Sequence, residues 1–102
     1  MTEPLVRPDL LQVVTLLDEL WRFREPMLRT HLQRASGMNY TLFSRYLEFL
    51  LDRDLVRLVA DDHGTPWVGL TRRGYEAHRH LVAGVRELYG PMGVRVGDRG
   101  LP

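Results

Sequence analysis

Hydrophobic residues recur every three or four positions in the first third of the chain, which predicts two amphipathic helices. The first covers residues 7–23, and its apolar stripe consists of Leu10, Val13, Val14, Leu17, Leu20 and Trp21. The second covers residues 24–36 and has Pro26 in its first turn, a position that proline favours. Its apolar face consists of Leu28, His31, Leu32 and Ala35. Gly37 ends this helix, because glycine adopts a left-handed conformation at little cost.

A third helix follows after a short turn, since Asn39 is a strong candidate for its N-terminal cap. It should end near residues 53–54. Its buried stripe consists of Phe43, Tyr46, Leu47 and Leu50. The opposite, polar face consists of Thr41, Ser44, Arg45, Glu48 and Asp52. Two helices joined by so tight a turn are typical of a helix-turn-helix.

The hydrophobic period then changes from the helical spacing to alternation, which predicts strands. Residues 56–60 and 67–70 form a β-hairpin around a loop at residues 61–66, with Trp67 expected to pack the hairpin on the core. The order helix, helix, helix, hairpin, helix predicts a mainly α, winged helix-turn-helix domain over residues 1–90.

The last helix, at about residues 72–89, is capped by Thr71 and carries two apolar stripes. One consists of Gly74, Ala77, Leu81 and Leu88, and the other of Tyr75, His78, Val82, Val85 and Tyr89. A helix that packs only on its own domain needs one stripe, so the second suggests a homodimer. The expected dimer residues are Leu81, Val82, Val85, Leu88 and Tyr89. A wide buried face within one domain is the alternative, and residues 91–102 form a Gly- and Pro-rich tail that we expect to be flexible.

Composition limits the range of functions. A chain of 102 residues that is 44% hydrophobic supports one core. It has no run of eighteen apolar residues for a membrane span and no signal-peptide pattern at its start. Cysteine is absent, so there is neither a disulfide framework nor a thiolate metal site. These features predict a cytoplasmic location.

Charge is unevenly distributed although the net charge is only +1. Residues 22–46 carry five arginines against one glutamate, whereas residues 47–62 carry two arginines against five acids. Every basic residue other than histidine is arginine, a bias that a GC-rich genome would produce without any function. Arginine also suits two-pronged contacts with phosphate and guanine.

Several motifs resemble those of the ArnR-like archaeal winged-helix DNA-binding domains. These motifs are Asn39-Tyr40, Phe43 with Tyr46-Leu47, and Leu70-Thr71 with Gly74. The similarity covers about residues 10–89 and implies a small DNA-binding protein, either a transcription regulator or a chromatin-associated dimer joined through its last helix. The shorter last helix and the absence of lysine weaken the comparison with the chromatin proteins more than that with the regulators.

A helix-turn-helix places the N-terminal part of its second helix against base edges in the major groove. The expected base contacts are Thr41, Ser44 and Arg45. The expected backbone contacts are Arg29, Arg34, Tyr40 and Arg73. Each could instead belong to a solvated surface, and Tyr40 could close the core beside the turn. Asp61 and Asp62 at the hairpin tip are unfavourable near phosphate, which keeps open a protein-interaction adaptor as the alternative.

Nothing in the pattern predicts catalysis. The four histidines match no metal-ligand spacing, and the chain has neither a Gly-rich phosphate loop nor a nucleophile elbow. The sequence therefore predicts a dimeric regulator that binds double-stranded DNA, without metal or cofactor. A non-specific chromatin protein is a further alternative.

Overall fold

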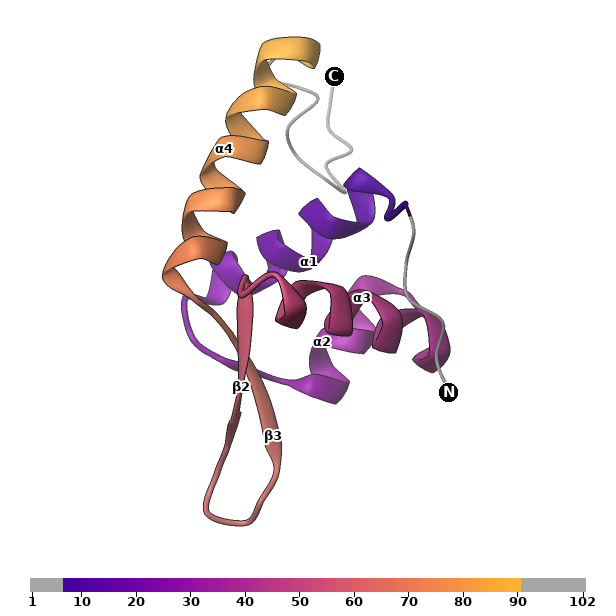
Figure 1. Cartoon of the computed structure of the whole chain (residues 1–102), viewed down its shortest axis with the longest axis vertical. Helices are drawn as coiled ribbons and strands as arrows, with labels where there is room; N and C mark the ends of the chain where they lie inside the picture. Colours follow the sequence, from indigo (N-terminus) through magenta and orange to yellow (C-terminus); the bar gives the residue numbers. More distant parts are fainter. Residues whose placement is uncertain (1–6, 91–102) are drawn as a thin grey trace.

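The computed structural model describes residues 7–90, beginning with helix α1 (Leu10–Phe23) (Figure 1). Asp9 caps α1, because its Oδ1 accepts a hydrogen bond of 2.8 Å from the backbone N–H of Leu11. The buried side of α1 consists of Val13, Val14, Leu16, Leu17 and Leu20. Arg24 ends the helix in a left-handed conformation, with φ 55°, and so redirects the chain. The tail expected over residues 91–102 lies outside the described residues.

The segment after α1 differs from the prediction. Met27–Leu28 is a short strand, β1, and helix α2 covers only Arg29–Ser36. Placing Pro26 in the first turn of the second helix was therefore wrong. Met27 is buried and pairs with Val68 of a strand forty residues further along the chain. Two residues are too few to show the alternation of apolar and polar side chains that is typical of a strand. Met27–Leu28 forms a strand because it pairs with β3.

The apolar face predicted for α2 is also narrower than expected. Leu32 is fully buried, whereas His31 and Ala35 are exposed. A helix of eight residues has little more than two turns. Its inner face is therefore filled by one leucine, and the wider face that the sequence suggested does not form.

Helix α3 (Tyr40–Asp52) begins and ends where the sequence predicts. The side chain of Asn39 caps it by accepting a hydrogen bond of 2.8 Å from the N–H of Leu42. The four residues of the predicted stripe are all buried, namely Phe43, Tyr46, Leu47 and Leu50. The Tyr46 hydroxyl accepts a hydrogen bond of 2.8 Å from the N–H of Asp9, which joins α3 to the start of α1.

The hairpin consists of β2 (Val56–Ala60) and β3 (Pro66–Leu70), and β3 starts one residue earlier than predicted. Both neighbours of β3 are antiparallel to it, in the order β1-β3-β2, so the sheet has three strands where the sequence predicted two. The base of the hairpin is buried, while β2 is exposed beyond Val56. The hairpin projects from the helical body as a wing (Figure 1).

Trp67 does not pack the hairpin on the core, contrary to the prediction. It is half-buried, and its indole Nε1 donates a hydrogen bond of 3.0 Å to Oδ2 of Asp61. An indole N–H needs an acceptor when it leaves water, and the loop supplies one. Through this hydrogen bond, Trp67 ties the loop at Asp61 to strand β3.

Helix α4 (Arg72–Tyr89) starts against the corner between α3 and β2. Thr71 caps it by accepting a hydrogen bond of 3.0 Å from the N–H of Gly74, and its hydroxyl donates one of 2.5 Å to the carbonyl of Asp54. A Cβ atom added to Gly74 would lie 2.0 Å from the carbonyl oxygen of Leu55. The Leu-Thr-x-x-Gly pattern is thus explained by a cap followed by a close backbone contact.

Further along, α4 crosses α1. His78 is buried, and its Nε2 lies 3.0 Å from Oδ1 of Asp18. Trp21 stacks on the His78 ring, with centroids 5.1 Å apart and planes inclined by 18°. Trp21 was predicted to be part of the buried stripe but is 37% exposed, because it lies at the edge of this crossing. Beyond the crossing, α4 rises away from the rest of the domain (Figure 1).

Candidate nucleic-acid interface

The turn between α2 and α3 is held by local hydrogen bonds. Gly37 adopts φ 75° and ends α2. The Ser36 hydroxyl donates a hydrogen bond of 2.6 Å to the carbonyl of Gln33 and accepts one of 3.1 Å from the N–H of Met38. Met38 itself is buried in the core. The start of α3 is consequently held in a defined position relative to α2.

The N-terminal half of α3 offers polar groups at the surface. Tyr40 and Thr41 are exposed, and Ser44 and Arg45 are half-buried. The suggestion that Tyr40 closes the core was wrong, since its side chain is 62% exposed. The first turn contains no acidic residue, so the positive end of the helix dipole is not offset there. Such a helix start favours an anion such as phosphate.

Arg45 is held mainly by packing. Its Nε is covered and has no hydrogen-bond partner among the described residues. The described part of the chain also provides no carboxylate in an ion pair with Arg45. Its charge therefore remains available to a ligand at the side of α3. Glu48 and Asp52 are exposed further along the helix and would repel phosphate, which limits an interface to its first half.

Of the arginines expected to contact the DNA backbone, two precede α3 in the chain and one follows it, and their side chains differ in solvent exposure. Arg34 and Arg73 are exposed, whereas Arg29 is half-buried at the start of α2. None of the three makes an ion pair or a side-chain hydrogen bond within residues 7–90. These arginines lie on α2 and α4, so the predicted DNA-binding site extends beyond α3.

The acidic wing tip is organised by one of its two aspartates. Oδ1 of Asp61 accepts hydrogen bonds from the N–H groups of His63 (2.8 Å) and Thr65 (2.9 Å), and Oδ2 accepts one from Trp67. The Trp67 hydrogen bond, followed by those from the backbone, lowers the pKa of Asp61 below its ordinary value. Asp61 is therefore a turn-forming residue, which the sequence analysis missed although the Asp-x-x-Gly spacing is a turn signal. Asp62 remains as an exposed acid.

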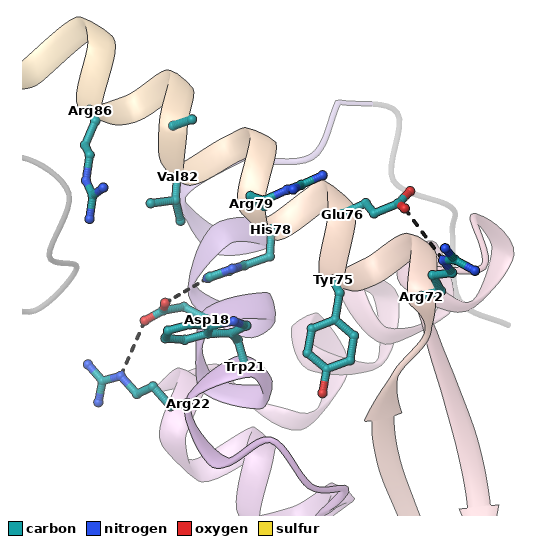
Figure 2. Close-up of a pocket in the computed structure, with 11 residues that line it drawn as sticks. Asp18, Trp21, Arg22, Arg72, Tyr75, Glu76, His78, Arg79, Val82 and Arg86 are labelled. Carbon is teal, nitrogen blue, oxygen red and sulfur yellow. Dashed lines mark hydrogen bonds and ion pairs between the residues drawn. The ribbon is translucent and has the colours of Figure 1, made fainter.

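A second feature is a groove between α1 and α4, which we call the α1–α4 groove. It has a volume of about 940 Å³, and an aromatic and apolar surface formed by Trp21, Tyr75 and Val82 lies within it (Figure 2). Its lining also includes His78, Ala83, the two acids Asp18 and Glu76, and four arginines. The sequence analysis identified the second apolar stripe of α4 but not this groove, because Trp21 comes from a distant helix.

Two helices joined by a tight turn, followed by a projecting hairpin and a further helix, define a winged helix-turn-helix fold, as predicted. A probable transcriptional regulator from Pseudomonas aeruginosa has a similar structure, with a TM-score of 0.69 and 24% identity, over 76% of this chain and 59% of that one. The transcriptional regulator BldR from Sulfolobus solfataricus aligns with a TM-score of 0.70 and 18% identity, over 86% of this chain and 63% of that one.

A third similar structure is Sso10a-2, a DNA-binding protein from Sulfolobus solfataricus. It aligns with a TM-score of 0.67 and 16% identity, over 84% of this chain and 90% of that one. The chain thus spans less than two thirds of the length of the first two proteins but most of the third. No protein-family profile and no curated protein matches the sequence.

The described residues, 7–90, offer neither a membrane-spanning helix nor a cluster of metal-ligating side chains. Between residues 7 and 90, no helix combines the length and the apolar character that crossing a bilayer requires. The same residues contain no cluster of three or more histidine, cysteine or acidic side chains that could hold a metal ion.

Proposed function

We propose that this protein is a DNA-binding transcription regulator that reads the major groove with the first half of α3. The observation that carries this proposal is the start of α3, where polar side chains and an uncompensated helix N-terminus meet without an acidic residue in the first turn. Support comes from the fold shared with transcriptional regulators and from the resemblance to ArnR-like DNA-binding domains.

The chemistry divides between bases and phosphates. Arg45 is suited to guanine, whose O6 and N7 accept two hydrogen bonds from a guanidinium. The hydroxyl groups of Thr41 and Ser44 can form hydrogen bonds with neighbouring bases or phosphates. The residues proposed to contact the DNA backbone are Arg29, Arg34, Tyr40 and Arg73. Their role would be to set the position of α3 along the duplex rather than to read sequence.

We also propose that the regulator is a homodimer joined through the exposed end of α4. Leu88 and Tyr89 are 79% and 71% exposed, and Val82 and Val85 are half-buried. Leu81 packs against its own core, so it contributes less to this surface than the sequence suggested. A two-fold dimer requires paired half-sites whose spacing follows the distance between the two α3 helices.

The test of DNA binding is fluorescence anisotropy with selected and random duplexes, at low and at physiological salt. We expect affinity to fall steeply as salt increases, because binding releases counterions from the phosphates. Replacing Arg45→Ala should weaken binding to the selected site by about 1–3 kcal/mol, and binding to random duplex by much less.

Arg53→Ala is the matched control, since Arg53 lies over the Phe49 ring at the far end of the same helix. Equal losses for the two variants, or no binding of the wild type at low salt, would refute the proposed reading helix. A loss that is the same on every duplex would point to a phosphate contact at Arg45 in place of base recognition.

A further inference from the structure

The α1–α4 groove carries positive charge that the described residues do not neutralise. Two of its four arginines pair with acids on their own helix, Arg22 with Asp18 (3.5 Å) and Arg72 with Glu76 (3.8 Å). The other two, Arg79 and Arg86, form no ion pair with any residue between 7 and 90. Seven residues of α-helix separate them, so they lie on the same side of α4, roughly 10 Å apart along its axis.

Beside these charges the groove offers a rigid aromatic surface. Trp21 is stacked on His78, and the guanidinium of Arg24 lies 5.0 Å from its ring centre. Tyr75 is 40% exposed, and Val82 lies on the same side of α4 (Figure 2). Since Trp21 is already held in place, an apolar partner gains contact area there at a low cost in conformational entropy.

The length of the groove favours an elongated occupant. Its lining extends along α4 from Arg72 to Arg86, which is roughly 21 Å of helix. A single small acid would contact one of the two unpaired arginines, whereas a helical segment of four turns would reach both. Helices bound in grooves place residues at helical spacing on an apolar surface, with charges at its rim.

A second copy of α4 does not supply the complementary charge. Arg72, Arg79 and Arg86 recur at intervals of seven and form one row beside the stripe of Tyr75, Val82 and Tyr89. The row on the other side of that stripe consists of Gly74, Leu81 and Leu88, which are all uncharged. In an antiparallel pair the arginine row would face itself, and in a parallel pair it would face the uncharged row. Neither arrangement places a carboxylate opposite Arg79 or Arg86.

We infer that the α1–α4 groove binds an acidic amphipathic helix of a partner protein. Its apolar stripe lies on Trp21, Tyr75 and Val82, and two carboxylates about two turns apart pair with Arg79 and Arg86. Because Val82 is also among the residues proposed for the dimer, the partner helix and a second copy of the chain compete for this part of α4. The wing projects from the other end of the molecule (Figure 1), so this partner leaves the wing accessible. Such a surface would allow a second protein to act on the regulator without competing for the wing.

The probe is a synthetic 18-residue helical peptide with leucines at helical spacing and two glutamates seven residues apart. Binding is followed by the fluorescence of Trp21 in a Trp67→Phe background, since the chain has two tryptophans. We expect saturable binding that the combined variant Arg79→Glu, Arg86→Glu weakens by about tenfold, because two attractive ion pairs at the rim become repulsive.

Two controls define the result. Arg57→Glu makes the same type of substitution at one position on the wing, with half the change in net charge of the combined variant, and should leave peptide affinity unchanged. A peptide with lysines in place of the glutamates should bind the combined variant better than it binds the wild type. Thermal unfolding of the combined variant, followed by circular dichroism, confirms that its fold is intact.

The inference is overturned by equal binding of the glutamate and lysine peptides, or by no binding at millimolar concentration. It is also overturned if benzoate, a small aromatic acid, binds through the same arginines while the peptide does not. If the peptide does not bind and the combined variant Arg79→Glu, Arg86→Glu loses self-association in sedimentation, the groove belongs to a second copy and the inference is overturned. DNA binding is measured separately, so its failure leaves the peptide result intact.

Discussion

The two halves of α4 carry the same apolar stripes but have different surroundings. The first two turns carry Gly74 and His78, both buried against the rest of the domain. The last turns carry Leu88 and Tyr89, which are the most exposed large hydrophobic residues in the described part of the chain. An apolar stripe runs through both halves, yet only one half is covered.

We propose that this difference divides two tasks along one helix. Its start anchors the helix to the corner that follows α3, through Thr71 and the close contact at Gly74. Its end remains available to another molecule, because α1 crosses it and then diverges (Figure 1). Contacts within the domain are therefore concentrated in the first half, and the proposed self-association uses the second. Changes to matched residues in the two halves should separate these effects.

The largest expected effect is at the two helical glycines. Gly74→Ala places a Cβ atom against the Leu55 carbonyl oxygen, and we expect a loss of about 3 kcal/mol in the free energy of unfolding. Gly84→Ala meets no atom within 4 Å and should stabilise the same helix by roughly 0.5–1 kcal/mol. Urea unfolding measures both. Similar values for the two variants would show that α4 is not anchored at Gly74.

A smaller effect is expected at the crossing with α1. His78→Ala removes the partner of Asp18 and the stack with Trp21, and should cost about 1–3 kcal/mol. His80→Ala, at an exposed position two residues away, should change stability by less than about 0.5 kcal/mol. Urea unfolding at neutral pH tests the pair, and a neutral His78→Ala would mean that the crossing contributes little.

The smallest change in stability is expected in the second half of α4, where Leu81 and Leu88 lie one heptad apart. Leu81→Ala should cost about 1–2 kcal/mol, less than the 2–5 kcal/mol of a fully buried leucine, because Leu81 is half-buried. Leu88→Ala, one heptad later, should leave unfolding of the monomer unchanged within about 0.5 kcal/mol. It should instead weaken self-association in sedimentation equilibrium. A wild type that is monomeric at all concentrations would contradict the proposed dimer.

Much of the fold was predictable from local signals. The cap at Asn39 and the stripe of α3 are as predicted, and so are the strand at residues 56–60 and the cap at Thr71. Each depends on neighbours within four residues or on a period that repeats over several turns. The interface proposed at the start of α3 rests on the same signals, since an exposed polar face is part of the helical pattern.

The features that were not predicted depend on contacts between distant residues. Met27 belongs to a strand because β3 passes beside it, and Trp21 is half-open because α4 crosses α1 at its edge. In each case the partner is absent from the local pattern, so the sequence could not indicate which group would be covered.

For α1, α3 and α4, the sequence alone determined where the helix forms and which of its faces are apolar. These properties come from backbone preferences and from side-chain periodicity, which act over one or two turns. Only the tertiary structure decided which apolar faces are buried and which remain open, as on the two ends of α4. That outcome depends on which elements meet, because burial is a property of two surfaces in contact and a periodic pattern describes only one of them.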